Sequence, residues 1–269
     1  TVNVTAVNDI PTITQVSDPS AILEDAGAQT ISLSGIGDGD LDATQTITVT
    51  ATSNNTSLIP DPAVTYTSDN ATGSLAYTPV SNANGTADIT VTVSDNGGTD
   101  NGGVNSATMT FTVNVTAVND IPSYSLGANQ SVDEDGGSQT VSNWATDISS
   151  GPSDESEQAL TFSLSNDNDS LFVSQPSVSS NGDLSYTPAD DAHGNAIVTI
   201  YLSDDGGTAN GGVDETSNST FTIEVVPVAD TPSITDASTL EDTQTLDGLV
   251  ISRNAADGDE VTHFKITGI

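Results

Sequence analysis

Short stretches in which apolar and polar residues alternate run along the whole chain. They are rich in Val, Ile, Thr and Leu, and clusters of Gly, Asn, Asp and Pro separate them. In the first 120 residues these stretches lie at 12–16, 29–33, 45–52, 63–66, 74–78, 87–94 and 107–115. A period of two bounded by turn residues predicts β-strands. No stretch has apolar residues at helical spacing over a helical length, so we expect no long helix.

The same order of stretches returns once more. The second set lies at 123–126, 139–143, 159–164, 172–175, 183–187, 196–203 and 219–226. The segment 1–11 is repeated letter for letter at 112–122 and more loosely at 222–232, which places Asp9, Asp120 and Asp230 111 and 110 residues apart. Self-similarity at a fixed long period predicts an array of one domain type.

The repeat divides the chain into expected domains. Residues 1–7 should be the last strand of a preceding repeat, 8–118 and 119–229 two complete repeats, and 230–269 the N-terminal part of a third. These ends cut across repeats, which predicts a parent array with more copies on both sides. Each complete repeat is predicted to be an all-β, seven-stranded antiparallel β-sandwich, and the sandwiches should follow one another end to end. We expect Tyr77, Tyr186 and Trp144 in the cores.

The charge of the chain restricts its partners. There are 38 acidic residues against two basic ones, which gives a formal net charge of −36. Such a chain does not neutralise phosphates, so nucleic acid and anionic membranes are excluded as partners. The segment contains no cysteine and no apolar run long enough to insert into a membrane. A charge excess of this size repels itself in the folded state, and counter-cations relieve that repulsion.

The strand order predicts where the acids gather. If successive strands alternate in direction, the first and fifth loops lie at the end of a repeat where the chain leaves, and the second and sixth loops lie where it enters. The first and fifth loops carry Glu24-Asp25, Glu134-Asp135, Glu241-Asp242 and Asp190-Asp191, while the second and sixth carry Asp38-Gly39-Asp40, Asp147, Asp257-Gly258-Asp259, Asp95 and Asp204-Asp205. Carboxylates from three sources should therefore meet at each Asn/Ala-Asp-x-Pro hinge. Ca²⁺, which prefers six to eight oxygen ligands, is the cation that such a junction suits.

This order of motifs resembles that of cadherin repeats. Val-Asn-Asp-Ile-Pro, Leu-Glu-Asp, Tyr-Thr-Pro and Leu-Ser-Asp-Asp-Gly-Gly resemble, more closely, the cadherin-like and immunoglobulin-like tandem repeats of long bacterial surface proteins and adhesins. The resemblance implies sandwiches stiffened by interdomain Ca²⁺. The ligand sets that it implies are Glu24, Asn119, Asp120, Asp147 and Asp204, with Asp25 as an addition, for the first junction; Glu134, Asp190, Asp191, Asp230, Asp257 and Asp259 for the second; and Asp9, Asp38, Asp40 and Asp95 for a site shared with a preceding repeat.

Two positions depart from the family pattern. The second repeat has Asp147-Ile148-Ser149 where the pattern has Asp-x-Asp, and the third hinge has Ala229 in place of Asn. The first junction is therefore expected to hold fewer or weaker ions, unless Asp154 or Glu155 contributes.

The sequence leaves several functions open. The first hypothesis is a calcium-rigidified, extracellular, cell-surface spacer whose partners are the neighbouring repeats. The second is an adhesive module that binds a glycan or a cell-surface protein through the long sixth loops at 95–105 and 204–218. The third is self-association into a surface filament or sheath. We expect no enzyme, because no cysteine nucleophile or glycine-flanked serine signature is present, and His193 is replaced by Asn84 in the first repeat.

Overall fold

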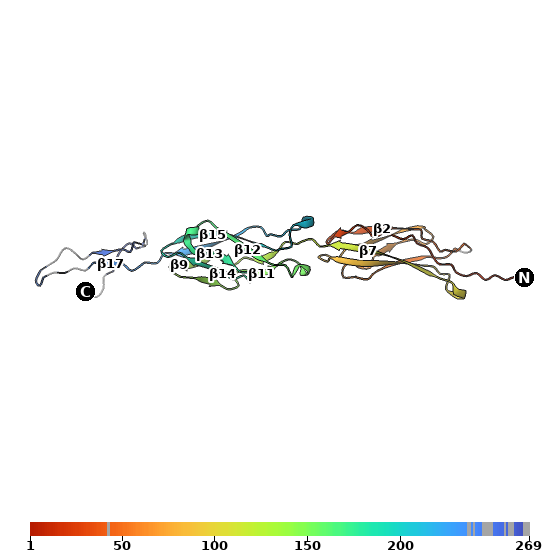
Figure 1. Cartoon of the computed structure of the whole chain (residues 1–269), viewed down its shortest axis with the longest axis horizontal. Helices are drawn as coiled ribbons and strands as arrows, with labels where there is room; N and C mark the ends of the chain where they lie inside the picture. The colour runs from red at the N-terminus through yellow and green to blue at the C-terminus, as the bar shows by residue number, and fades with distance from the viewer. Residues whose placement is uncertain are drawn as a thin grey trace. The chain divides into compact units, whose positions relative to one another are not determined.

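A computed structural model describes residues 1–41, 44–235, 238, 240–243, 250–255, 257 and 261–265. The chain forms two compact units. The first comprises Thr1–Asn119 together with Pro152–Glu155 and Thr208–Gly212, and the second comprises Asp120–Gly151, Ser156–Gly207 and Val213–Ile269. Figure 1 traces the strands of both units.

The first unit has two sheets. The four-stranded sheet has the order β1-β7-β6-β3, and the three-stranded sheet has the order β2-β5-β4. All neighbours are antiparallel except β1 and β7, which are parallel. The strands are β1 (Ile22–Leu23), β2 (Gln29–Ser34), β3 (Thr48–Ser53), β4 (Ala63–Thr65), β5 (Thr72–Tyr77), β6 (Gly85–Ser94) and β7 (Ser106–Thr116).

The core of the first unit comes from the inward positions of both sheets. Every second residue of β6 is buried, and β7 places Met109, Phe111 and Val113 beside them. Leu75 and Tyr77 of β5 belong to the same buried cluster. Period-two burial on two facing sheets is the arrangement of a β-sandwich, so the predicted all-β class is confirmed.

The second unit repeats this plan with two additional two-stranded sheets. Its sheets have the orders β12-β15-β16-β9, β10-β14-β13 and β11-β8, and β17 pairs with β18 beyond them. The pair β9 and β16 is parallel, as β1 and β7 are in the first unit. The strands are β8 (Ser123–Ser125), β9 (Gln130–Asp133), β10 (Gln139–Val141), β11 (Thr146–Ser149), β12 (Thr161–Asn166), β13 (Phe172–Val178), β14 (Leu184–Pro188), β15 (Gly194–Ser203), β16 (Ser219–Val226), β17 (Ser233–Ile234) and β18 (Ile251–Ser252).

The core of the second unit is built around Trp144 and Tyr186, which are buried as expected. The indole Nε1 donates a hydrogen bond of 2.8 Å to the carbonyl oxygen of Ala128, and the ring lies 4.4 Å from that of Phe221. A buried Trp needs such a partner for its N–H.

The first predicted strand differs from the expectation in the first repeat, whereas in the second repeat the predicted 123–126 forms β8 (Ser123–Ser125). In the first unit, residues 12–16 form only the isolated bridge between Thr12 and Gly37 and a bond from Thr14 N–H to the Ser34 carbonyl oxygen. The chain then crosses to the other sheet, where β1 pairs with β7. Pro19 has no N–H to continue a ladder, and the Asp18 carboxylate instead accepts a bond from the N–H of Thr112. The second unit divides in the same way into β8 and β9.

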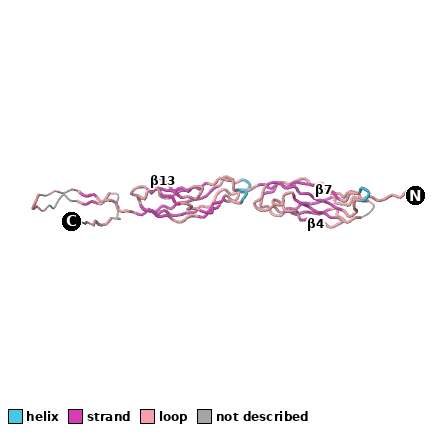
Figure 2. Tube along the Cα trace, turned by 90° about the horizontal axis from the view of Figure 1, so that it is seen from below, coloured by secondary structure: helices cyan, strands magenta, loops and turns pink. Residues whose placement is uncertain are grey.

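Helical structure is limited to short turns in loops, cyan in Figure 2. In the described part of the chain these are four 3-10 turns of three residues each. The absence of a long helix was expected. None of the described helices is long and apolar enough to cross a membrane.

Candidate metal centres

A buried glutamate holds the departing chain in each unit. Glu24 and Glu134 are both 5% exposed. Oε1 of Glu24 accepts a hydrogen bond of 2.5 Å from the N–H of Val118, and Oε1 of Glu134 accepts one of 2.7 Å from the N–H of Val228. Each valine precedes the hinge by one residue. The first-loop glutamates therefore bind the start of the hinge in both units. The first loop and the hinge were predicted to lie at the same end of the repeat.

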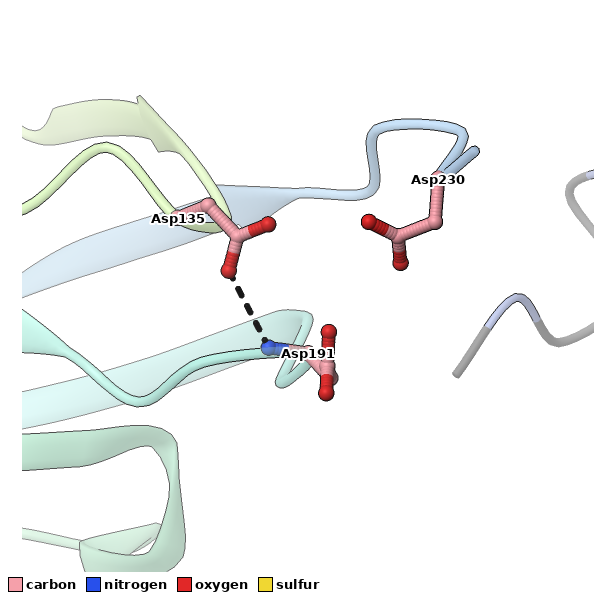
Figure 3. A group of neighbouring side chains, drawn as sticks. All are labelled: Asp135, Asp191 and Asp230. Carbon is pink, nitrogen blue, oxygen red and sulfur yellow. Dashed lines mark hydrogen bonds between the residues drawn. The ribbon is translucent and has the colours of Figure 1, made fainter. Parts of the chain in front are cut away.

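Three carboxylates meet beside Glu134 in the second unit. Asp135 comes from the loop after β9, Asp191 from the loop between β14 and β15, and Asp230 from the hinge after β16. Figure 3 shows the three side chains around one space, and an oxygen of each lies within 4.8 Å of those of the other two. The N–H of Asp191 donates a bond of 3.4 Å to Oδ1 of Asp135. The structure thus brings together the first loop, the fifth loop and the hinge.

The electrostatics of this cluster are unfavourable without a cation. Burial raises the pKa of Asp230, and the charges of Asp191, Asp257, Asp135 and Glu134 raise it further. A raised carboxyl pKa means that the ionised form is disfavoured where it stands. A cation at this position would remove that penalty.

Asp257 adds a fourth carboxylate to the hinge. It is 3% exposed, and its Oδ1 accepts a bond of 2.7 Å from the N–H of Asp230. Its Oδ2 is buried and has no hydrogen-bond donor among the described residues. Asp190, which was also predicted here, is exposed and does not join the cluster. Asp259 lies outside the described residues.

A second acidic group lies where the chain enters the first unit. The N–H of Asp9 donates to Oδ1 of Asp40 at 3.2 Å, and Oδ2 of Asp38 accepts from the N–H of Gln45 at 3.0 Å. Gly39 between the two acids has a φ of +79°, and a Cβ there would stand 2.2 Å from the carbonyl oxygen of Ile10. Only glycine lets this loop approach the hinge so closely.

Asn8 joins Asp95 and the sixth loop to the same group. Its Nδ2 donates to Oδ1 of Asp95 at 3.0 Å and to the carbonyl oxygens of Gly98 and Val104 at 3.2 and 2.9 Å. Asp95 is 8% exposed, and its Oδ2 is buried without a donor among the described residues. The structure therefore brings Asp9, Asp38, Asp40 and Asp95 to one end of the first unit.

The predicted ligands of the first junction are divided between the units. Glu24 and Asn119 belong to the first unit, and Asp120, Asp147 and Asp204 to the second. Asp147 has a φ of +52° and accepts a bond of 2.8 Å from the hydroxyl of Ser125. Oδ1 of Asp204 accepts from the N–H of Gly206 at 2.9 Å, as Asp95 does from Gly97. Whether these residues share a site stays a prediction.

The predicted ligand sets omit three residues of these groups. Asp135 was expected near the hinge, because it follows Glu134 in the first loop, but it was not named as a ligand. Asn8 precedes the predicted Asp9 in the repeated hinge. Gln45 opens a predicted strand, and nothing in one sequence distinguishes it from the other glutamines.

The donor set fits Ca²⁺. Carboxylate oxygens make up the described clusters, with neutral amide and backbone oxygens beside them, which are the ligands that calcium prefers. Asp95 and Asp257 each have a buried oxygen that no described donor satisfies. Buried carboxylate oxygens require a donor or a cation. The chain has no Cys and two His, so a soft-metal centre does not fit these groups.

Comparisons with known proteins give structural likenesses only. No family model matches the sequence, and no curated protein matches it. Among solved structures the chain is similar to EC1-2 of human protocadherin-24 (16% identity, 80% of this chain and 98% of that one, TM-score 0.46), EC22-24 of mouse cadherin-23 (19%, 82% and 65%, 0.43) and cadherin domains 1-5 of protocadherin gamma B2 (14%, 83% and 41%, 0.49). At these identities and TM-scores the likenesses carry nothing about what the chain binds.

Proposed function

We propose that this chain is a run of calcium-stabilised spacer repeats from an extracellular surface protein or adhesin of a bacterium. The observation that carries the proposal is the meeting of Asp135, Asp191 and Asp230, from two loops and a hinge, within 4.8 Å of one another. The buried Oδ2 of Asp257, for which no described residue is a donor, supports the same site. The bacterial and surface context rests on the motif resemblance.

The proposed role follows from where the ligands come from. Asp135 and Asp191 belong to loops of one sandwich, Asp230 to the hinge, and Asp257 to the segment beyond it. An ion bound by residues of these separate segments restricts the hinge. Only those hinge conformations remain in which every ligand reaches the ion. When the ion concentration exceeds the dissociation constant, the free energy by which binding stabilises those conformations grows with the logarithm of the ratio of the two. A chain of such hinges would act as a stiff stalk, without enzymatic activity.

Calcium titration of the whole chain tests the proposal. We expect isothermal titration calorimetry to show Ca²⁺ binding, and Asp191→Asn to remove or weaken the site in the second unit. Asp191 has a φ of +56°, which Asn tolerates as readily as Asp, so the substitution changes charge and not backbone. Glu224→Gln, on the exposed face of β16, is the charge-matched control.

The mechanical part of the proposal has its own test. Chelation should widen the distribution of end-to-end distances measured by small-angle X-ray scattering, and calcium should narrow it. An unchanged profile in a chain that binds calcium would leave a metal site that does not stiffen the hinge. No calcium binding at all would overturn the whole proposal.

A further inference from the structure

Gln45 lies among the acids at the entry end of the first unit. Its backbone N–H donates to Oδ2 of Asp38 at 3.0 Å. Its side-chain Nε2 donates to Oδ2 of Asp40 and, at 2.6 Å, to Oδ1 of Asn8. One glutamine thus contacts both acids of the second loop and the hinge. The carboxamide NH₂ lies between two oxygens, where a cation would also be favoured.

The other end of the same carboxamide has no hydrogen-bond donor among the described residues. Oε1 of Gln45 is buried, and no described residue donates a hydrogen bond to it. Asp95, 8% exposed, has in the same group an oxygen, Oδ2, that is also buried and that receives no bond within the described part of the chain. A Cβ added to Gly97 would stand 2.5 Å from Oε1 of Gln45 and 1.9 Å from Oδ1 of Asn8, so the sixth loop encloses the carboxamide. Acceptors buried without donors are costly and call for an explanation.

The second repeat has a glutamine at the same position. Gln158 stands at the matching position, immediately before the stretch that becomes β12, and its Oε1 is also buried. The residue after each glutamine donates to a side chain at the equivalent position of the sixth loop. The N–H of Thr46 donates to Oδ1 of Asn96 at 2.9 Å, and the N–H of Ala159 to Oδ1 of Asp205 at 2.8 Å. The two glutamines therefore start from equivalent backbone positions.

We infer that Gln45, and Gln158 in the second repeat, are neutral oxygen ligands of the proposed calcium sites. This inference rests on the proposed function and adds a ligand that the acidic motifs do not contain. The terminal torsion of glutamine is broad and nearly two-fold. Turning it brings Oε1 to the place that Nε2 takes between Asp40 and Asn8. The amide then serves as a hydrogen-bond bridge without the ion and as a ligand with it.

A neutral ligand has a specific advantage in this chain. A net charge of −36 already opposes the folded state, and a carbonyl oxygen raises the coordination number without adding to that charge. Ca²⁺ accepts six to eight such oxygens, whereas Mg²⁺ keeps several waters and gains less from an extra protein carbonyl. Gln45 and Gln158 should therefore favour Ca²⁺ over Mg²⁺.

Calorimetric titration of the full chain with Ca²⁺ and with Mg²⁺ tests this inference. We expect Gln45→Ala and Gln158→Ala to lower the calcium affinity of their sites about tenfold, in the range typical of residues that support a metal ligand set, and to change magnesium affinity less. Gln29→Ala, at the start of β2, is the matched control and should bind as the native chain does. If the NMR spectrum of Gln45→Ala in chelator shows that this variant does not fold, the nearly isosteric Gln45→Met is used in its place.

A second readout follows the carboxamide itself. The side-chain ¹⁵N–¹H₂ signals of Gln45 and Gln158 should move on addition of calcium, while those of Gln29 should not. Unchanged calcium affinity in the Gln45 and Gln158 variants, with unmoved signals, overturns the inference and leaves the proposed function standing. Absence of calcium binding in the native chain overturns both.

Discussion

The bond between Glu134 and the hinge can be tested without any metal. Oε1 of Glu134 accepts from the N–H of Val228 at 2.7 Å, and the side chain is 5% exposed. A hydrogen bond to a charged acceptor contributes about 1.5 to 3 kcal/mol. Glu134→Ala leaves the N–H without this acceptor, so we take a loss of about 2 kcal/mol for the local opening of the hinge.

Amide hydrogen exchange measures this loss at a single group. In chelator, protection of the Val228 N–H should fall roughly 30-fold in Glu134→Ala, since every 1.4 kcal/mol is a factor of ten. Glu134→Gln keeps an oxygen acceptor but loses the charge. A neutral bond is about half as strong as a charged one, so protection should fall only about fivefold.

The first unit supplies an independent replicate. Glu24→Ala should have the same effect on the N–H of Val118, which is bonded to Oε1 of Glu24 at 2.5 Å. Glu224→Gln removes one charge from the outer face of β16 and should leave both valines unchanged. Unaltered protection of Val228 in Glu134→Ala would refute the claim that this glutamate fixes the start of the hinge.

Three further predictions concern other parts of the chain. Without calcium, the thermal stability of the second unit should fall as pH rises from 3.8, the ordinary pKa of an aspartate, through the raised pKa of Asp230. In this range the folded state binds more protons than the unfolded state, so raising the pH favours unfolding. Calorimetry at several pH values should show this fall, and calcium should reverse it. Gly39→Ala forces a side chain onto the Ile10 carbonyl oxygen at a φ of +79°, and should cost about 1 to 3 kcal/mol in urea unfolding; no loss would contradict the close approach. Trp144→Ala should cost about 3 to 5 kcal/mol, and Trp144→Phe much less; Tyr201→Ala, on the outer face of β15, is the control.

The alternation of apolar and polar residues predicted most of the strands. β6 and β15 bury every second residue, so a period-two pattern was enough to place them. The parallel strands β1 and β9 have two and four residues, which is too short to show a period. The pairing of β1 depends on where Pro19 and the Asp18 side chain let the chain cross between sheets, and Asn129, whose Oδ1 accepts from the N–H of Thr222, stands at the corresponding place before β9. A local pattern does not contain such crossings.

The candidate sites were predictable only in part. Loop order placed Glu134, Asp191, Asp230 and Asp257 at one end because strand direction alone determines which end a loop occupies. Within a loop, backbone conformation decides which acid lies beside the hinge. Both residues of Asp190-Asp191 are exposed, but the second has a φ of +56° and lies beside Asp135 and Asp230, whereas Asp190 does not belong to that group. A sequence of two equal acids does not reveal this choice.

The hinge sequence itself has two separable roles in the structure. Asn8 has a role besides any that its Oδ1 plays toward a cation, because its Nδ2 donates to Asp95 and to two carbonyl oxygens of the sixth loop. It fastens that loop to the hinge, whereas the N–H of the following Asp9 donates to Oδ1 of Asp40. Ala229 takes the place of this asparagine in the third hinge, so there the fastening is absent while Asp230 keeps its carboxylate neighbours. The asparagine and the aspartate of the repeated motif should therefore be separable by mutation. Asn8→Ala should increase amide exchange across residues 97–103 without abolishing calcium binding, and Asp9→Asn should weaken calcium binding without loosening that loop.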